Sequence, residues 1–176
     1  MVNYSVVECS LEEHGEAILA VLNDAIENST ALYDYKPRTM DNMVPWFAAK
    51  AAGNFPVIGL ISDDGVLIGF GSFGTFRAWP AYKYTVEHSI YLHRDYRGIG
   101  LGKVLLQLVI DAAVARDLHA VIGVIDSTNE GSIALHKKLG FKCAGTLPQV
   151  GFKFGRWLDV DLYQLTLAGP SHPIDG

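Results

Sequence analysis

The stretch that decides the fold is His88-Ser-Ile-Tyr-Leu-His-Arg-Asp-Tyr-Arg-Gly-Ile-Gly-Leu-Gly102. It begins as an apolar strand, passes through a polar turn and reaches Gly98, Gly100 and Gly102 directly before an amphipathic helix. The first N–H groups of a helix lack intrahelical partners and carry partial positive charge. Glycines let an anion approach such groups closely. With Arg97 as a cation at the rim, the stretch predicts an anion-binding loop.

Two common phosphate-binding loops do not fit these residues. A Walker loop needs Gly-Lys followed by Ser or Thr, whereas Gly102-Lys103 is followed by Val104. A dinucleotide fingerprint reads Gly-x-Gly-x-x-Gly, whereas the spacing here is Gly-x-Gly-x-Gly. On the glycines alone, a turn that binds nothing remains the alternative.

The loop resembles motif A of the GCN5-related N-acetyltransferases (the GNAT family), Gln/Arg-x-x-Gly-x-Gly/Ala, which is matched by Arg97, Gly100 and Gly102. The resemblance extends over about residues 3–167. The segments Asn129-x-x-Ser132 and Leu139-Gly140-Phe141 are similar to the family's second coenzyme A segment. Within the family, three segments resemble the phosphinothricin and methionine sulfone/sulfoximine acetyltransferase branch: Thr85–Ser89, Pro148–Gly151 and Gly155–Asp159.

This resemblance implies an α/β GNAT fold, with one mixed, mostly antiparallel sheet of about seven strands, a V-shaped splay and helices on both faces. Residues 1–168 would form a single N-acetyltransferase domain, and residues 169–176 a flexible tail. Acetyl-CoA would be the cosubstrate, its pyrophosphate held by the loop amides. The residues expected to contact it are Ile90, Tyr91, Leu92, Arg97, Gly98, Ile99, Gly100, Leu101, Gly102, Lys103, Asn129 and Ser132. A helix cap is the alternative role for Asn129.

Composition excludes several other classes. The 176 residues are 49% apolar and 19% charged, which is typical of one folded domain. A net charge of −5 argues against nucleic acid as the main partner. There is no apolar run of 18 residues and no secretion signal at the N-terminus, so a soluble, cytoplasmic protein is expected. Cys9 and Cys143 are predicted to be free thiols, and no metal is expected because no residues have ligand spacing.

Hydrophobic spacing predicts the remaining elements. Strands are expected over 3–8, 57–62, 66–73, 84–92, 121–125, 141–145 and 159–167. Four helices are expected. The first ends at about residue 27, the second spans 41–52, the third begins at residue 101, and the fourth is short and ends at residue 140. Ser10 and Glu13 indicate a capping box for the first helix. In the second helix Pro45 is expected in the first turn, and Gly53 is expected to end it.

Two residues are candidates for proton transfer. An amine needs to lose a proton during acyl transfer, and Glu87 on the central strand can accept it. The alternative is an ordinary strand carboxylate that faces solvent or pairs with Lys83. Many family members place a tyrosine where this chain has His136, and the phosphinothricin-type members resemble it in having histidine there. His136 could protonate the leaving thiolate, the alternative being a packed helix histidine.

The acceptor site is expected around Phe76-Arg77-Ala78-Trp79-Pro80. A guanidinium group holds a carboxylate in two parallel hydrogen bonds, and the resemblance implies that Arg77 does this for an α-carboxylate. A solvated surface arginine is the alternative. The other residues expected to bind the acceptor are Tyr33, Phe76, Trp79, Thr85 and Val86, with Tyr82 helping to shape the pocket.

The sequence therefore predicts an enzyme that acetylates the α-amino group of a small amino-acid-like molecule, such as phosphinothricin, methionine sulfoximine or methionine sulfone. The reaction would be direct attack with Glu87 as general base. Alternatives are acetylation of a protein N-terminus or another amine, and a non-catalytic acyl-CoA-binding module. A homodimer is expected, and the aromatic residues of Gly151–Trp157 suggest either a dimer contact or a substrate lid.

Overall fold

The computed structural model of the protein describes residues 2–175, which form two compact units. The first unit holds the described residues up to Phe73 and the segment Ser89–Val109. The second unit holds Gly74–His88 and the described residues from Ile110 onward. The chain therefore passes from one unit to the other inside regular elements rather than through linkers.

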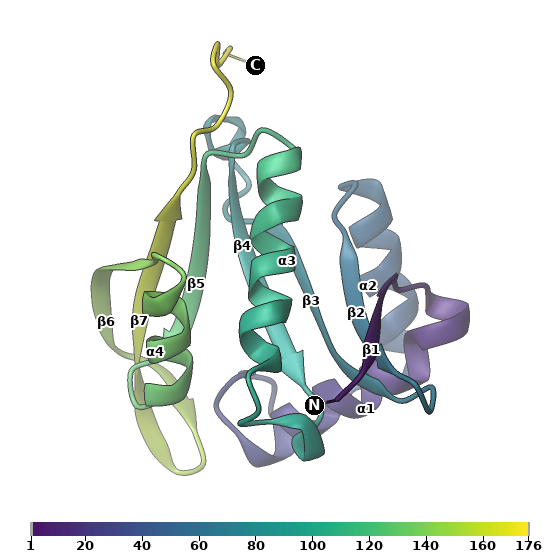
Figure 1. The fold of residues 1–176 in the computed structure, drawn as a ribbon. Helices are drawn as coiled ribbons and strands as arrows, with labels where there is room; N and C mark the ends of the chain where they lie inside the picture. Colours follow the sequence, from purple (N-terminus) through teal and green to yellow (C-terminus); the bar gives the residue numbers. More distant parts are fainter. Residues whose placement is uncertain (1, 176) are drawn as a thin grey trace. The chain divides into compact units, whose positions relative to one another are not determined.

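The first unit combines strands and helices from the N-terminal half of the chain. Its elements are β1 (Tyr4–Glu8), α1 (Leu11–Asn28), α2 (Met40–Ala52), β2 (Val57–Ser62), most of β3 (Leu67–Thr75), the last part of β4 (Thr85–Leu92), the 3-10 helix η2 (Arg94–Tyr96) and the first part of α3 (Leu101–Ala115). β2 pairs antiparallel with β1 and β3 (Figure 1). The β2–β3 hairpin is confirmed, with Gly65 at a φ of +80° in its turn.

The second unit is built around the C-terminal strands. Its elements are the first part of β4, the 3-10 helix η1 (Pro80–Tyr82), the last part of α3, β5 (Ala120–Asp126), α4 (Glu130–Lys138), β6 (Lys142–Lys153) and β7 (Arg156–Thr166). β4 and β5 pair in parallel, with Val86 opposite Val121. β7 lies antiparallel to both β5 and β6, and α4 packs beside these strands (Figure 1).

The strands form one seven-stranded sheet in the order β1-β2-β3-β4-β5-β7-β6. The sheet is mixed and mostly antiparallel, as predicted, with β4 and β5 as a parallel pair. Four α-helices accompany it among residues 2–175. No helix in this part of the chain has the length and apolar character needed to cross a membrane.

Helices lie on both sides of the strands in the first unit. One buried cluster includes Ile18 and Met43 from α1 and α2 together with Phe70 from β3. A second cluster includes Ile68 from β3 and Leu105 from α3. Side chains along the strands thus divide between two helix layers, which explains why the strands are apolar on both faces.

The N-terminus of α1 differs in one detail from the expected capping box. The Ser10 hydroxyl accepts a hydrogen bond from the Glu13 backbone N–H at 3.2 Å, as predicted. The reciprocal bond comes from a different residue, because the Ser10 N–H donates to His14 Nδ1 at 3.1 Å. The Glu13 side chain was therefore the wrong partner. His14 lies one position further along the first turn and reaches the same backbone donor.

Helix α2 corrects the expected position of Pro45 and confirms that Gly53 ends the helix, because Gly53 is its C-cap. It begins at Met40, so Pro45 lies inside the helix rather than in its first turn, where its ring nitrogen cannot donate a hydrogen bond. Gly53 follows the helix with a φ of −81°, and Asn54 adopts the left-handed conformation at +51°. A Cβ on Gly53 would lie 2.2 Å from the ring of Phe55, so this glycine is required by close packing rather than by its backbone angle.

The last two strands are longer than the sequence suggested. β6 continues to Lys153 and β7 begins at Arg156, so the aromatic segment forms the end of a hairpin. A register shift between Leu147 and Gly151 absorbs extra residues on β6, and Gln149 within it has a φ of +54°. Proline and glycine inside a strand pattern suggest an early end, whereas a bulge accommodates them here.

Candidate active site

The predicted anion loop lies in the first unit and has the backbone that its glycines allow. Gly98 and Gly100 have φ angles of +78° and +91°, which favour glycine, and α3 begins immediately afterwards at Leu101. A Cβ at either glycine would have no atom within 4 Å, so the space beside the loop is open. Gly102 is already helical. The N-terminus of α3 therefore follows a loop with open space beside it, an arrangement suited to an anionic group such as a pyrophosphate.

Arg97 is held by the protein on two sides. Its Nε donates to the Leu92 carbonyl oxygen at 3.1 Å, and its Nη2 donates to Asp24 Oδ2 at 2.7 Å. Arg94 donates to the other carboxylate oxygen of Asp24. Asp24 belongs to α1, and its side chain is only 13% exposed. Partial burial raises the pKa of the Asp24 carboxyl, but hydrogen bonds from Asn28, Arg97 and Arg94 outweigh it and lower this pKa.

Asp24 is a site-supporting residue that sequence reasoning missed. It lies 73 positions from Arg97, and a single aspartate on an amphipathic helix carries no local sign of its partners. Asp24 and Asp95 together balance the charges of Arg94 and Arg97, and Lys103 in the first turn of α3 adds a further cation, which suits an anionic ligand.

The last three residues of β4, Ile90–Leu92, pack their side chains against the core of the first unit. Ile90 and Leu92 pack against the cluster that includes α3, whereas Tyr91 packs against the cluster of α1 and α2. Any contact between this segment and a cosubstrate therefore falls to its backbone groups. Tyr33, also in the first unit, is 39% exposed and lies in the connection between α1 and α2. An Arg38–Asp34 ion pair of 2.7 Å braces that connection.

Glu87 lies in the second unit, half-buried on β4. Burial raises the pKa of its carboxyl group above the usual range, and the charge of Arg77 partly opposes this rise. Lys83 is not its partner, because the Lys83 amine lies over the Tyr84 ring, 5.2 Å from the centroid. A carboxylate with a raised pKa in a partly buried place is suited to accept and release a proton.

The aromatic residues near Arg77 form a small cluster. The Arg77 guanidinium lies 4.8 Å from the centroid of the Phe76 ring, and that ring meets Tyr82 edge to face at 5.6 Å. Trp79 is 72% exposed, so it packs little against the described chain. Val86 is 2% exposed, which places its side chain in the core and leaves only its backbone for an acceptor. Thr85 is partly exposed at the start of β4.

The second coenzyme A segment forms the N-terminus of α4. Asn129 is its N-cap, and its Oδ1 accepts a hydrogen bond from the Ser132 N–H at 3.1 Å. Asn129 is exposed, and its side-chain oxygen caps the helix. The predicted capping role is thus present, and it is compatible with a ligand contact.

His136 is enclosed on α4. Its side chain is 2% exposed, Nδ1 lies 2.7 Å from the Ser132 carbonyl oxygen, and Nε2 lies 2.9 Å from Nε2 of His88. Burial lowers the pKa of the His136 ring, although the Ser132 carbonyl partly opposes this. Both ring nitrogens face protein atoms. This geometry lends no support to the acid role of His136, which stays a prediction.

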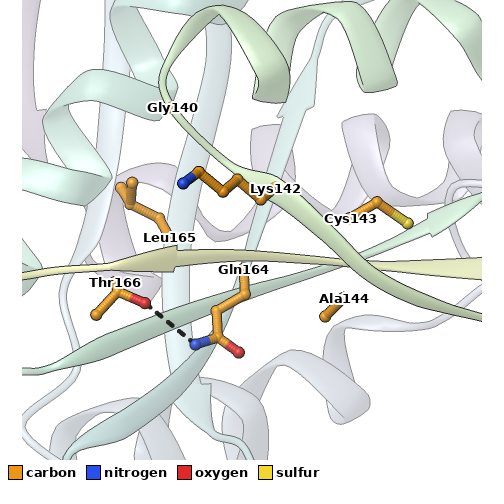
Figure 2. A pocket seen from close by; sticks show the side chains of 7 residues that line it. All are labelled: Gly140, Lys142, Cys143, Ala144, Gln164, Leu165 and Thr166. Carbon is orange, nitrogen blue, oxygen red and sulfur yellow. Dashed lines mark hydrogen bonds between the residues drawn. The ribbon is translucent and has the colours of Figure 1, made fainter.

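A separate cavity of about 460 Å³ lies on the C-terminal strands (Figure 2). It is lined by Gly140, Lys142, Cys143, Ala144, Gln164, Leu165 and Thr166. Across it, Gln164 Nε2 donates to the Thr166 hydroxyl at 3.2 Å. None of the residues predicted for catalysis or binding lines this cavity, so it does not mark the predicted chemistry.

Comparison with known proteins agrees with the sequence prediction. The model of the acetyltransferase (GNAT) family matches residues 19–141. The L-methionine sulfoximine/L-methionine sulfone acetyltransferase of Pseudomonas paraeruginosa is 44% identical over 150 residues, covering 85% of this chain and 87% of the relative.

Two solved structures extend the likeness over the whole chain. One from Acinetobacter baylyi is 56% identical with a TM-score of 0.99, covering 100% of this chain and 98% of that one. The phosphinothricin acetyltransferase of Sinorhizobium meliloti, solved in complex with acetyl-CoA, is 29% identical with a TM-score of 0.91, covering 98% of this chain and 93% of that one.

Proposed function

The chain belongs to the GNAT family and is an N-acetyltransferase; from this premise we propose that it acetylates the α-amino group of a small amino-acid-like acceptor with acetyl-CoA. Methionine sulfoximine, methionine sulfone and phosphinothricin are the first candidates, because relatives with similar chains act on them. Acetyl-CoA as donor is supported by its presence in the Sinorhizobium meliloti structure. Because acetyl-CoA is made and used inside cells, the proposal includes a cytoplasmic location.

The observation that carries the proposal is the combination of Glu87 and Arg77 in one unit. Arg77 is exposed and bears a fixed positive charge that acts on Glu87. An α-amino acid offers a carboxylate and an amine two bonds apart, so a guanidinium that holds the carboxylate brings the amine toward a nearby base. The Phe76 and Tyr82 rings would contact the side chain of the acceptor.

Glu87 is proposed as the general base. The neutral amine attacks the thioester carbonyl carbon, and the proton lost by nitrogen passes to the Glu87 carboxylate, directly or through water. The carbon–sulfur bond then breaks and the electron pair leaves on the thiolate sulfur. A raised carboxyl pKa increases the affinity of Glu87 for that proton. No covalent bond to the enzyme is needed.

The residues proposed to hold acetyl-CoA fit an extended anionic ligand. The open backbone beside Gly98 and Gly100 and the N-terminus of α3, with Ile99, Leu101 and Lys103, would bind the pyrophosphate. The exposed Asn129 amide would donate to a carbonyl of the pantetheine arm. Ser132 contributes indirectly, because its N–H orients the Asn129 side chain.

The β6–β7 hairpin is proposed as the contact of a homodimer. β6 is the last strand of the sheet, and its residues are almost all exposed. Large apolar side chains gather on this hairpin: Leu147 is 42% exposed, Val150 53%, Phe152 45%, Phe154 58% and Trp157 59%. An apolar edge strand is otherwise prone to aggregation, and a second copy of the chain would cover it.

Thiol release from acetyl-CoA tests the proposed function. The acceptors would be the three candidates, the common amino acids, an aminoglycoside and a peptide with a free N-terminus. Saturable release with the candidates is expected. Release with the peptide alone would favour the N-terminal acetyltransferase, and coenzyme A binding without release with any amine would favour a binding module. Either result would contradict the proposal.

A further inference from the structure

His88 and His136 form a buried pair in the second unit. His88 follows Glu87 on β4, and His136 lies in the last turn of α4. Their Nε2 atoms are 2.9 Å apart, and their ring centroids are 5.0 Å apart with the ring planes inclined by 27°. The side chains are 7% and 2% exposed. Two histidines 48 positions apart therefore share one hydrogen bond inside the protein.

The neighbours of the pair determine where its protons lie. The Ser132 carbonyl oxygen can only accept, so His136 Nδ1, at 2.7 Å, must carry a hydrogen and donate it. A neutral imidazole has one N–H, so His136 Nε2 carries no hydrogen and can only accept a hydrogen bond. His88 must then donate its Nε2 hydrogen to His136. Burial lowers the pKa of both rings, that of His88 to about 3, so both are neutral at neutral pH.

The surrounding structure is shaped to hold the two rings. Gly123 on β5 leaves room for them, because a Cβ there would lie 3.0 Å from His88 Nε2 and 3.1 Å from His136 Nε2. The Phe141 ring meets both imidazoles edge to face, at 5.6 and 5.0 Å. The hydrogen bond thus lies in a buried place beside an aromatic ring, where it is stronger and more costly to leave unmade than in water.

The pair links two segments of the proposed site. From His136 the bonds continue to the Ser132 carbonyl, and the Ser132 N–H donates to the side chain of Asn129. On the other side, His88 adjoins Glu87 in the same strand. Each bond in this series joins described residues of the second unit, and its two ends are the proposed base and the proposed pantetheine contact.

We propose that the His88–His136 hydrogen bond is a positioning device, which sets the N-terminus of α4 and its Asn129 relative to Glu87. The two histidines are positioning residues and exchange no proton with either substrate. This inference rests on the proposed function, in which Glu87 accepts the amine proton and Asn129 binds the donor. It also offers an alternative to the predicted acid role of His136, whose Nε2 is an acceptor already used by His88.

The first test observes the protons directly. In the wild-type protein labelled with ¹⁵N-histidine, NMR correlations at pH 7.5 are expected to show His88 protonated at Nε2 and His136 at Nδ1. A His136 ring protonated at Nε2 would overturn the assignment. This measurement needs no turnover, so it stays informative even if the proposed function is wrong.

The second test compares two variants of His88. His88→Gln keeps a donor, whereas His88→Phe keeps a ring without a donor. His88→Phe is expected to weaken coenzyme A binding in calorimetry and to raise the KM for acetyl-CoA about fivefold or more. His88→Gln should stay within about twofold of wild type. Equal behaviour of His88→Phe and wild type would overturn the inference.

Two further variants separate positioning from acid catalysis and from misfolding. His136→Gln should leave the basic limb of the kcat–pH profile in place, and loss of that limb would show that His136 is the acid. Gly123→Ala crowds the pair without removing a nitrogen and should reproduce the raised KM. Normal coenzyme A affinity in folded Gly123→Ala would contradict the proposal. Absence of turnover in wild type with every amine would instead refute the proposed function.

Discussion

Arg77 lowers the pKa of the Glu87 carboxyl, against the larger rise that burial causes. The net pKa is raised, so the proposed base lies between two opposing effects. Removing the Arg77 guanidinium leaves only the effect of burial, so the pKa of Glu87 should rise further. We therefore expect Arg77→Ala to move the acidic limb of the kcat–pH profile to higher pH, because Glu87 must lose its proton before it can act.

The same variant tests the proposed carboxylate contact. Arg77→Ala should raise the KM for the amino acid far more than the KM for acetyl-CoA, and equal effects would contradict the contact. Lys83→Ala is the matched control. It removes a neighbouring cation that lies over Tyr84 and does not act on Glu87, so neither the acidic limb nor the KM should change.

Glu87→Gln removes the proposed base while keeping the shape of the side chain. We expect kcat to fall about 10²–10⁴-fold, the usual contribution of a positioned acid or base, and the acidic limb due to Glu87 to disappear. Steady-state rates across pH measure both. Glu16→Gln, an exposed carboxylate on α1, should behave as wild type. Unchanged turnover of Glu87→Gln at every pH would show that another group accepts the proton.

Gly100→Ala tests the anion loop. The φ of Gly100 is +91°, and a side chain in left-handed backbone costs about 1–2 kcal/mol. The loop should relax, so coenzyme A affinity measured by calorimetry should fall at least fivefold while the KM for the acceptor changes little. Gly145→Ala is the control: a Cβ there has no atom within 4 Å, and its φ is not positive. Equal affinity of the two variants would contradict the assignment.

Acid should destabilise the protein through the buried histidine pair. The pKa of His88 falls from 6.5 to about 3 on folding, so below pH 6.5 the unfolded chain binds a proton that the folded chain does not. The free energy of unfolding should then fall by about 1.4 kcal/mol per pH unit, or about 2 kcal/mol at pH 5 from His88 alone.

Urea titrations at pH 7, 6 and 5 measure this loss. His88→Phe should be less stable than wild type at pH 7 and should show a shallower loss toward pH 5. His172→Gln, which changes an exposed histidine, should follow the wild-type curve. A wild-type slope identical to that of His88→Phe would place the acid sensitivity elsewhere.

The proposed dimer should separate when charge is added to its edge strand. Val150 and Phe154 are 53% and 58% exposed, so replacing both by Asp should disturb little within one chain. Light scattering after size-exclusion chromatography should give twice the chain mass of 19.2 kDa for wild type and the mass of one chain for the double variant. Ile174→Asp, at an exposed position in the C-terminal segment, should remain dimeric. A wild-type protein with the mass of one chain would refute the dimer.

The elements of the fold were largely predictable because their signals are local. Helix α3 followed from apolar residues at helical spacing after Leu101, and the β2–β3 hairpin followed from an Asp-Asp-Gly turn between apolar runs. The predictions failed at two places where the structure departs from a local rule. Pro45 is tolerated inside α2, and the bulge at Gln149 carries β6 past the residues that suggested its end.

The features of the candidate site were also predictable only where they depend on near neighbours in the sequence. The glycines of the loop and the Asn129 cap were visible as patterns of a few residues, since backbone angle and helix capping depend on near neighbours. The sequence also indicated Glu87 as a candidate base and Arg77 as a candidate carboxylate contact. What it could not show was which cation acts on Glu87, because Lys83 was as plausible by position as Arg77.

Local patterns of residues were therefore enough to indicate the family, the order of strands and helices, and the glycine turn before α3. Tertiary structure alone decided that Arg97 pairs with Asp24 and that His136 is enclosed by His88. The reason is physical: the backbone conformation of a turn or cap is set within a few residues, whereas the partner of a buried polar group depends on which elements fold against each other.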